Sequence, residues 1–168
     1  MSKYKPLSSI TTPRFAEVST FFRLPIEKEL NNLDYCICGV PWDGGTTNRP
    51  GARHGPREIR NASSLIRVYH PNSLKSPYDN FNVADIGDCP VNPADLNDTL
   101  KKIEKFYTKI ASSNTIPISF GGDHLVSLPI LRGLKNKKPF GLFQFDSHSD
   151  TWDSYFGDYK YTHGTPFR

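Results

Sequence analysis

The pattern of apolar residues along the chain predicts short strands alternating with helices. Runs with the length and composition of strands cover residues 34–40, 82–88, 115–120 and 140–145. The last run is aromatic and lacks polar alternation, which is typical of a buried strand in a parallel sheet. The first run ends at Pro41, a residue that cannot continue the hydrogen-bonded ladder of a central strand. We therefore expect an α/β fold built on a parallel sheet.

Three segments between and after these runs have helical character. Pro56 suits the first turn of a helix that we expect to extend from residue 55 to about residue 69. Asn92 and Pro93 predict the cap and the start of a second helix. Residues 125–134 predict a third. In the second helix, apolar residues recur every three or four positions, which predicts a face directed toward the core: Leu96, Leu100, Ile103, Phe106 and Ile110.

The first 33 residues differ from the rest of the chain. They place Pro6, Pro13 and Pro25 among polar residues, with a short Phe-Phe pair as an apolar feature. We expect residues 1–33 to form an irregular arm with at most one short helix. The remaining residues, 34–168, have the size and apolar content of one domain with a packed core.

Composition and charge exclude several classes of protein. The net charge of +4 comes from scattered basic residues, and no nucleic-acid recognition motif accompanies them. Three cysteines without a Cys-x-x-Cys pair argue against a disulfide framework or a thiolate zinc site. No apolar run approaches the ~20 residues of a membrane span, and the polar N-terminus does not resemble a signal peptide. We expect a protein of the reducing cytoplasm with no nucleic-acid or membrane partner, in which Cys36 and Cys38 pack as small apolar residues.

A candidate metal site follows the last apolar run, where Asp146, His148 and Asp150 occupy alternate positions. In open α/β sheets, ligands bind just beyond the carboxyl ends of the strands. Alternate side chains of a straight strand are roughly 6.6 Å apart, too far for all three to reach one ion at about 2.1 Å. Either the chain curls after Asp146, or two ions about 3.5–4 Å apart share the three residues. The alternative without a metal is an Asp/Ser-rich turn with His148 exposed.

Two further histidines are candidate site residues. Two glycines at positions 121 and 122 permit a sharp turn after the strand 115–120, and this turn places His124 at a neighbouring strand end. A metal site that combined His124 with the Asp-x-His-x-Asp motif would take ligands from two strand ends, whereas His124 alone would be a residue near a helix cap. His163 is a candidate proton carrier, because histidine titrates near neutrality.

The segment 41–60, after the first predicted strand, contains four glycines and three prolines. Its glycine spacing matches no dinucleotide motif, and no Gly-Lys-Ser/Thr sequence follows, so it is not a phosphate loop. A long loop at the carboxyl end of a strand suggests function. The alternative is ordinary solvation and turn chemistry for its polar residues Asp43, Arg49, Arg53 and His54.

Four motifs, in this order, resemble those of the ureohydrolase family. They are Gly-Val-Pro-Trp-Asp-Gly-Gly-Thr-Thr with Arg-Pro-Gly-Ala-Arg-His-Gly-Pro-Arg-Glu-Ile-Arg, then Ser-Phe-Gly-Gly-Asp-His, then Phe-Asp-Ser-His-Ser-Asp-Thr-Trp-Asp, and finally His-Gly-Thr-Pro-Phe-Arg. The resemblance covers about residues 36–168. It is closer to the agmatinase branch, with guanidinobutyrase, guanidinopropionase and guanidine hydrolase, than to true arginases. It implies a three-layer α/β/α, arginase-like fold on a parallel β-sheet.

The resemblance also implies hydrolysis of a guanidino compound to urea and an amine or ammonia by two metal ions, usually manganese. His124 resembles a ligand of the first metal, His148 a ligand of the second, and Asp146 the carboxylate that bridges both. Asp150 resembles a ligand of the first metal that also handles a proton, and His163 resembles the proton-shuttling histidine. Carboxylate and imidazole ligands suit Mn²⁺ but do not exclude Ni²⁺. Family members commonly form homo-oligomers, as trimers or hexamers.

One departure from the family pattern concerns the remaining metal ligands. The family takes two more ligands from an Asp-x-Asp motif on a later strand, and no such motif follows here. We therefore expect residues 34–168 to be the N-terminal portion of a single catalytic domain, with a fold that is incomplete at the C-terminus. The alternatives are an inactive fragment or binding subunit, and a metal-dependent deacetylase of the same broad fold. The substrate stays open among agmatine, guanidinobutyrate or guanidinopropionate, and guanidine.

Overall fold

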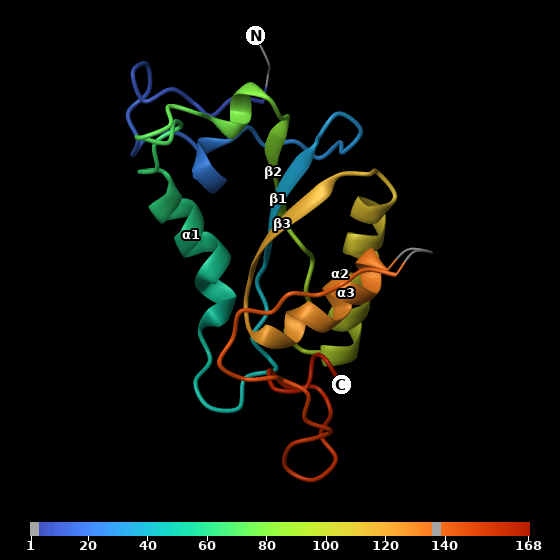
Figure 1. The fold of residues 1–168 in the computed structure, drawn as a ribbon. Coiled ribbons are helices and arrows are strands. Elements are labelled where there is room, and N and C mark those ends of the chain that lie inside the picture. The colour runs from blue at the N-terminus through green and yellow to red at the C-terminus, as the bar shows by residue number, and fades with distance from the viewer. Residues whose placement is uncertain (1–3, 136–138) are drawn as a thin grey trace.

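A parallel sheet of three strands lies at the centre of the molecule. The computed structural model describes residues 4–135 and 139–168. Its strands are β1 (Tyr35–Val40), β2 (Val83–Asp88) and β3 (Ile116–Gly121). They pair in the order β2-β1-β3, so β1 is central. All three carboxyl ends therefore point to the same end of the molecule (Figure 1).

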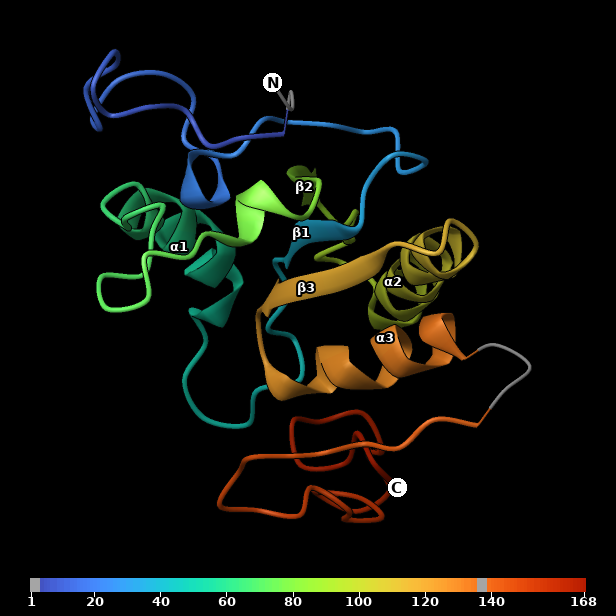
Figure 2. The same ribbon diagram turned by 45° about the horizontal axis from the view of Figure 1, so that its top comes forward.

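Three α-helices cover the sheet on both faces. Helix α1 (Gly55–Ser63) lies on one face, and α2 (Leu96–Ala111) and α3 (Ser127–Leu134) lie on the other (Figure 2). This arrangement confirms the predicted three-layer α/β/α fold. Within the described ranges, no helix combines the length and the apolar character that a membrane span requires. Short 3-10 helices occur in the connections, at Phe21–Arg23, Ala52–His54, Pro77–Asp79 and His124–Val126.

Three of the four predicted strands are confirmed, with ends that differ by at most one residue. The fourth prediction, a buried strand at residues 140–145, is wrong. That segment pairs with no described strand, and the Phe143 and Phe145 side chains are 91% and 99% exposed. In Figure 2 it crosses below α3 instead of running beside β3. An apolar run becomes a strand only where a neighbouring strand pairs with its backbone, and apolarity does not identify that neighbour.

Two predicted helix boundaries are also wrong. Helix α1 ends at Ser63 and not near residue 69, because Leu65 and Ile66 are exposed and have no core to pack against. Helix α2 begins at Leu96, and its cap is Asp95, whose Oδ1 accepts the Asp98 N–H at 3.0 Å. The predicted start at residue 93 therefore lies before the first helical turn.

The main core fills the space between the sheet and α2. The predicted apolar face of α2 is confirmed, since its members are buried or partly buried: Leu96, Leu100, Ile103, Phe106 and Ile110. Tyr107 is also buried, and its hydroxyl donates to Ser119 Oγ on β3 at 2.6 Å. Cys36 and Cys38 pack in this core as predicted, and burial raises the pKa of the Cys36 thiol to about 12.

The N-terminal arm packs against β2. The Asp85 N–H donates to the Pro25 carbonyl at 3.0 Å, and the buried Phe21 contributes to a second core on the α1 side. The described part of the arm contains one short 3-10 helix, as predicted. Arg60 of α1 joins these parts, because its Nε lies 2.9 Å from Asp85 Oδ2 and its guanidinium lies 4.0 Å from the centroid of the Phe21 ring.

Candidate metal centre and surrounding loops

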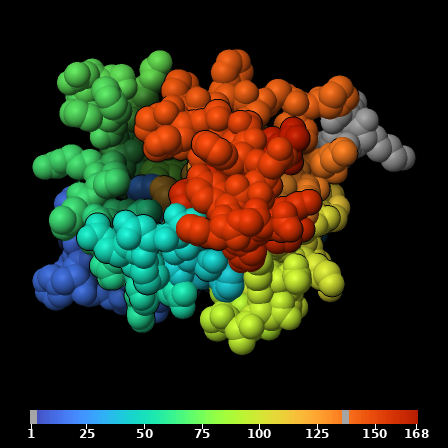
Figure 3. Space-filling model, turned by 90° about the horizontal axis from the view of Figure 1, so that it is seen from below, coloured from blue at the N-terminus to red at the C-terminus, as the bar shows by residue number. Residues whose placement is uncertain are grey.

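Three irregular segments meet at the carboxyl end of the sheet. They are the loop 41–54 after β1, the turn 121–126 after β3, and the C-terminal segment, which we define as residues 139–168. Figure 3 shows this end of the molecule, where the C-terminal segment (orange to red) lies against the loop 41–54 (cyan). Most of the candidate site therefore rests on loop and turn backbone that follows the strands β1 and β3.

His124 is held by the turn that follows β3. It is the first residue of the 3-10 helix His124–Val126, which is capped by Asp123 through a hydrogen bond from the Leu125 N–H to Oδ1 at 2.8 Å. The half-buried imidazole stands edge-on to the Phe167 ring, with 5.3 Å between ring centroids. Sequence and structure therefore agree that His124 lies at the end of a central-layer strand.

Asp146 and Asp150 bring carboxylate oxygens to the same imidazole nitrogen. Asp150 Oδ2 lies 2.9 Å from His124 Nδ1, and Asp146 Oδ2 lies 3.6 Å from it. The chain bends at residues 146–148, and Asp150 adopts a left-handed backbone with φ of 51°. Such a conformation is uncommon for a residue other than glycine and occurs often at functional sites. Of the two geometric alternatives, the structure shows the curl after Asp146.

Asp146 lies between two histidines. One oxygen faces His124, and the other, Oδ1, lies 3.5 Å from His148 Nδ1 and accepts the His148 backbone N–H at 3.0 Å. That hydrogen bond is the main cause that lowers the pKa of Asp146 below its usual value. The His148 side chain is 80% exposed and does not join His124 and Asp150. Asp146 therefore has the placement that a shared carboxylate would need.

The group formed by His124, Asp146 and Asp150 fits a divalent ion. Its three ligand atoms lie within 4.8 Å of one another. Two ligands that bind one ion at about 2.1 Å, roughly 90–110° apart, are separated by about 3.0–3.4 Å. The observed separations of 2.9 and 3.6 Å are close to that range. Oxygen and imidazole donors without thiolate suit Mn²⁺ and also accept Ni²⁺.

His163 lies outside this group of ligand atoms and contacts the loop 41–54. Its backbone N–H donates to the Gly45 carbonyl oxygen at 2.9 Å, and its ring Nδ1 lies 3.2 Å from the same oxygen. The Tyr155 ring flanks the imidazole, with 5.9 Å between centroids. Within the described part of the chain, Nε2 forms no hydrogen bond. Nδ1 is therefore the ring nitrogen that the loop 41–54 holds.

Asp123 and Gly45 support the site, although the sequence pattern does not single them out. Asp123 Oδ2 accepts the Gly45 N–H at 2.6 Å. Burial raises the pKa of Asp123, and the N–H groups of Gly45 and Leu125 oppose that shift. The available sequence signal is the position of Asp123 directly before His124. Nothing in the sequence pairs it with a glycine 78 positions away.

The loop 41–54 is stabilised by Asp43, whose side chain is fully buried. Its Oδ2 accepts the Gly51 N–H at 2.7 Å, and its Oδ1 accepts from Arg53 Nε at 2.5 Å. Burial alone would raise the pKa of Asp43, but these bonds hold it below its usual value. Turn chemistry therefore accounts for Asp43 and Arg53. Arg49 and His54 are exposed.

Two cavities differ in their relation to the site. An open cleft of about 490 Å³ borders the metal group and is lined by Gly122, Asp123, His124, Ser127 and Asp146, among others. It has space for a small substrate beside the ligand atoms.

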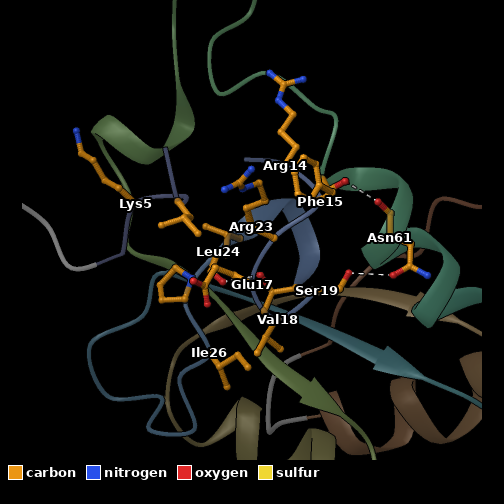
Figure 4. A pocket seen from close by; sticks show the side chains of 15 residues that line it. Lys5, Arg14, Phe15, Glu17, Val18, Ser19, Arg23, Leu24, Ile26 and Asn61 are labelled. Atoms are coloured by element: carbon orange, nitrogen blue, oxygen red, sulfur yellow. Dashed lines mark hydrogen bonds between the residues drawn. The ribbon is translucent and has the colours of Figure 1, made fainter. Parts of the chain in front are cut away.

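The other cavity, of about 580 Å³, lies under the N-terminal arm at the far end of the molecule (Figure 4). Lys5, Arg14 and Arg23 line it, and each already donates a hydrogen bond at 3.0–3.1 Å within the described ranges. None of the predicted site residues lines this cavity.

Known proteins are similar to this chain in sequence along nearly its whole length. The Arginase family matches residues 33–168. The chain is 57% identical to guanidinopropionase from Pseudomonas aeruginosa, over 98% of this chain and 52% of that protein. It is 42% identical to mitochondrial agmatinase from Gallus gallus, over 97% of this chain and 48% of that protein. The chain thus spans about half the length of the curated relatives it matches.

Solved structures share its fold. The structure of proclavaminate amidinohydrolase from Streptomyces clavuligerus has a TM-score of 0.86 and 35% identity, over 94% of this chain and 53% of that one. A hypothetical agmatinase from Burkholderia thailandensis has a TM-score of 0.87 and 32% identity, over 99% and 52%. These likenesses confirm the predicted arginase-like fold, of which the chain forms about half.

Proposed function

Because the chain belongs to the arginase family, we propose that the complete protein hydrolyses a small guanidino compound to urea and an amine. The observation that carries this proposal is the convergence of His124, Asp146 and Asp150 at the carboxyl end of β3. This convergence brings His124, at the end of β3, together with two carboxylates of the C-terminal segment, and metal sites in proteins commonly combine ligands from separate segments in this way. The guanidinopropionase relative makes a guanidino acid the first substrate to test.

In the complete protein, His124, Asp146, His148 and Asp150 would hold the metal ions, and Asp146 would be the ligand that two ions share. Its two oxygens face His124 and His148, which supports this division. When bound, Mn²⁺ or Ni²⁺ supplies Lewis acidity and lowers the pKa of the attacking water. The two carboxylates would offset half of the charge of two divalent ions, which weakens the repulsion of a positively charged guanidinium group.

Two residues of this chain would move protons. Asp150, whose Oδ2 lies at the metal group, would accept a proton from the attacking water. His163, which lies outside that group, would take up a proton from solvent at Nε2 and give it to the leaving amine, because an amine is a poor leaving group without a general acid. Asp150 would return its proton to solvent. The products then balance as urea and a protonated amine.

The decisive experiment measures urea release by the complete protein loaded with Mn²⁺ or Ni²⁺. The substrates to compare are 3-guanidinopropionate, 4-guanidinobutyrate, agmatine and guanidine. We expect metal-dependent urea release from at least one of them. Asp146→Asn should abolish it and lower metal content, because the variant removes the charge of the shared ligand.

The matched control is Asp158→Asn, which changes an exposed carboxylate of the same segment and should keep both urea release and metal content. Full activity and full metal content in Asp146→Asn would contradict the assignment. Release of acetate from acetylated amines, without urea from any guanidino compound, would favour a deacetylase instead. Size-exclusion chromatography with light scattering would test the expected homo-oligomer, a trimer or hexamer.

A further inference from the structure

We propose that Asp123 is a positioning residue that acts on His163 through Gly45. In this arrangement, the Asp123 carboxylate fixes Gly45, and the Gly45 carbonyl holds His163 as the Nδ1–H tautomer with Nε2 free for proton transfer. The role of Nε2 in catalysis rests on the proposed function. The tautomer itself does not, because it follows from hydrogen bonds within the described chain.

The first half of the linkage joins the turn after β3 to the loop after β1. The Asp123 side chain is buried, and each of its oxygens accepts one backbone N–H: Gly45 at 2.6 Å and Leu125 at 2.8 Å. The Asp123 N–H donates to the Trp42 carbonyl at 2.8 Å. Two of these bonds join the turn to the loop, and the bond to Leu125 fixes the Asp123 side chain within the turn, so Gly45 has little freedom relative to His124.

The second half joins the same loop to His163. The Gly45 carbonyl oxygen lies 2.9 Å from the His163 backbone nitrogen and 3.2 Å from ring Nδ1. A carbonyl oxygen can only accept, so the ring contact is attractive only when Nδ1 carries the hydrogen. In the neutral imidazole, Nε2 is then the unprotonated nitrogen. The hydrogen bond from the His163 backbone N–H to the same Gly45 oxygen holds the ring close enough for the Nδ1 contact to form.

Glycine at position 45 makes the close approach feasible. A Cβ atom there would lie 2.7 Å from Leu125 Cβ and 3.0 Å from Asp123 Oδ2. The first distance is shorter than real Cβ contacts allow, so a side chain would push the loop away from the turn. The geometry of His163 therefore depends on contacts that span three segments of the chain.

Asp123→Asn is the sharpest variant, because it preserves shape and replaces one accepting oxygen by an N–H donor. One of the two backbone N–H groups would then face another donor. The matched control is Asp95→Asn, which makes the same change at the cap of α2, remote from the site. Asparagine is also a good helix cap, so this control should remain folded.

The first measurement does not involve activity. In the metal-free complete protein labelled with ¹⁵N-histidine, the His163 signal is identified by its absence in His163→Ala. We expect the Nδ1–H tautomer in the wild type and in Asp95→Asn, and a mixture of tautomers in Asp123→Asn. A folded wild type whose His163 is the Nε2–H tautomer would overturn the proposal, whatever reaction the protein catalyses.

The second measurement is kinetic and uses a double-mutant cycle. We expect Asp123→Asn to lower kcat by about 10- to 100-fold, part of the ~10²–10⁴ that a general acid contributes, with KM and metal stoichiometry near normal. In a His163→Ala background the same change should have almost no further effect. Equal effects in both backgrounds, or loss of a metal ion in Asp123→Asn, would show that Asp123 acts on the metal group and not on His163.

Discussion

The central sheet and the C-terminal segment are ordered by different interactions. In β1, every residue from Cys36 to Val40 is buried, and both edges of the strand pair with a neighbour. In the C-terminal segment, the described residues form no helix or strand, and Phe143 and Phe145 are almost fully exposed. Yet this segment supplies Asp146, Asp150 and His163. Burial builds the scaffold, whereas most of the site depends on a few hydrogen bonds.

Those hydrogen bonds connect the C-terminal segment to itself and to the loop after β1. The Phe167 N–H donates to the Asp150 carbonyl at 3.2 Å, and the Trp152 N–H donates to the Gly164 carbonyl at 3.2 Å. The His163 N–H reaches Gly45 at 2.9 Å. A segment held in this way opens at lower free energy than a buried strand. Experiments that disturb one region and not the other can therefore separate scaffold from site.

The largest loss of urea release should appear when the 168-residue chain is tested by itself. We expect no sustained urea release, because three ligand atoms converge in its described part and only His148 lies on the other side of Asp146. Weak binding of one ion is the most that this set supports. Urea assays and equilibrium dialysis in excess Mn²⁺ or Ni²⁺ check this. Sustained turnover by a monodisperse preparation would show that the site is sufficient as described.

Replacing the proton carrier should have the next largest effect. In the complete protein, His163→Ala is expected to lower kcat by ~10²–10⁴, the usual contribution of an acid–base group. Metal stoichiometry should stay near normal, because His163 lies outside the group of ligand atoms. Steady-state kinetics and metal analysis of the same preparation test both points. Loss of one metal equivalent would instead identify His163 as a ligand.

Two alanine substitutions in the 168-residue chain compare the core around the central sheet with the C-terminal segment. Ile103→Ala should lower the free energy of unfolding by about 2–5 kcal/mol, because Ile103 is fully buried between α2 and the sheet. Phe145→Ala should change it by less than about 0.5 kcal/mol, because that side chain is 99% exposed. Denaturant unfolding measures both. Similar losses would mean that the C-terminal segment packs as tightly as the core.

The smallest expected effect is the loss of folding stability when Asp43 is replaced, and this loss should depend on pH. The folded-state pKa of Asp43 is lowered, so its carboxylate stabilises the fold above the unfolded pKa, and this contribution is lost as pH falls through the folded pKa. At pH 7, Asp43→Asn should be less stable than the wild type by about 1.5–3 kcal/mol, the range for hydrogen bonds to a charged group. The difference should shrink as pH is lowered from about 5 to 2. A difference that does not depend on pH would assign the effect to packing.

The sequence by itself determined the layered part of the fold. Three strands, the apolar face of α2 and the buried cysteines follow from the local spacing of apolar residues, because that spacing decides the type of element and which of its faces turns toward the core. The motifs also identified His124, Asp146 and Asp150, which the structure brings together. These are the features that side-chain identity specifies within a short stretch of chain.

Only the tertiary structure decided the rest. It placed residues 140–145 below α3 and not in the sheet, turned His148 outward, and linked Asp123 to His163 through Gly45. Each of these outcomes depends on backbone N–H and carbonyl groups of residues far apart in the sequence. Nearly every residue carries those groups, so no pattern of side chains can show which of them will meet.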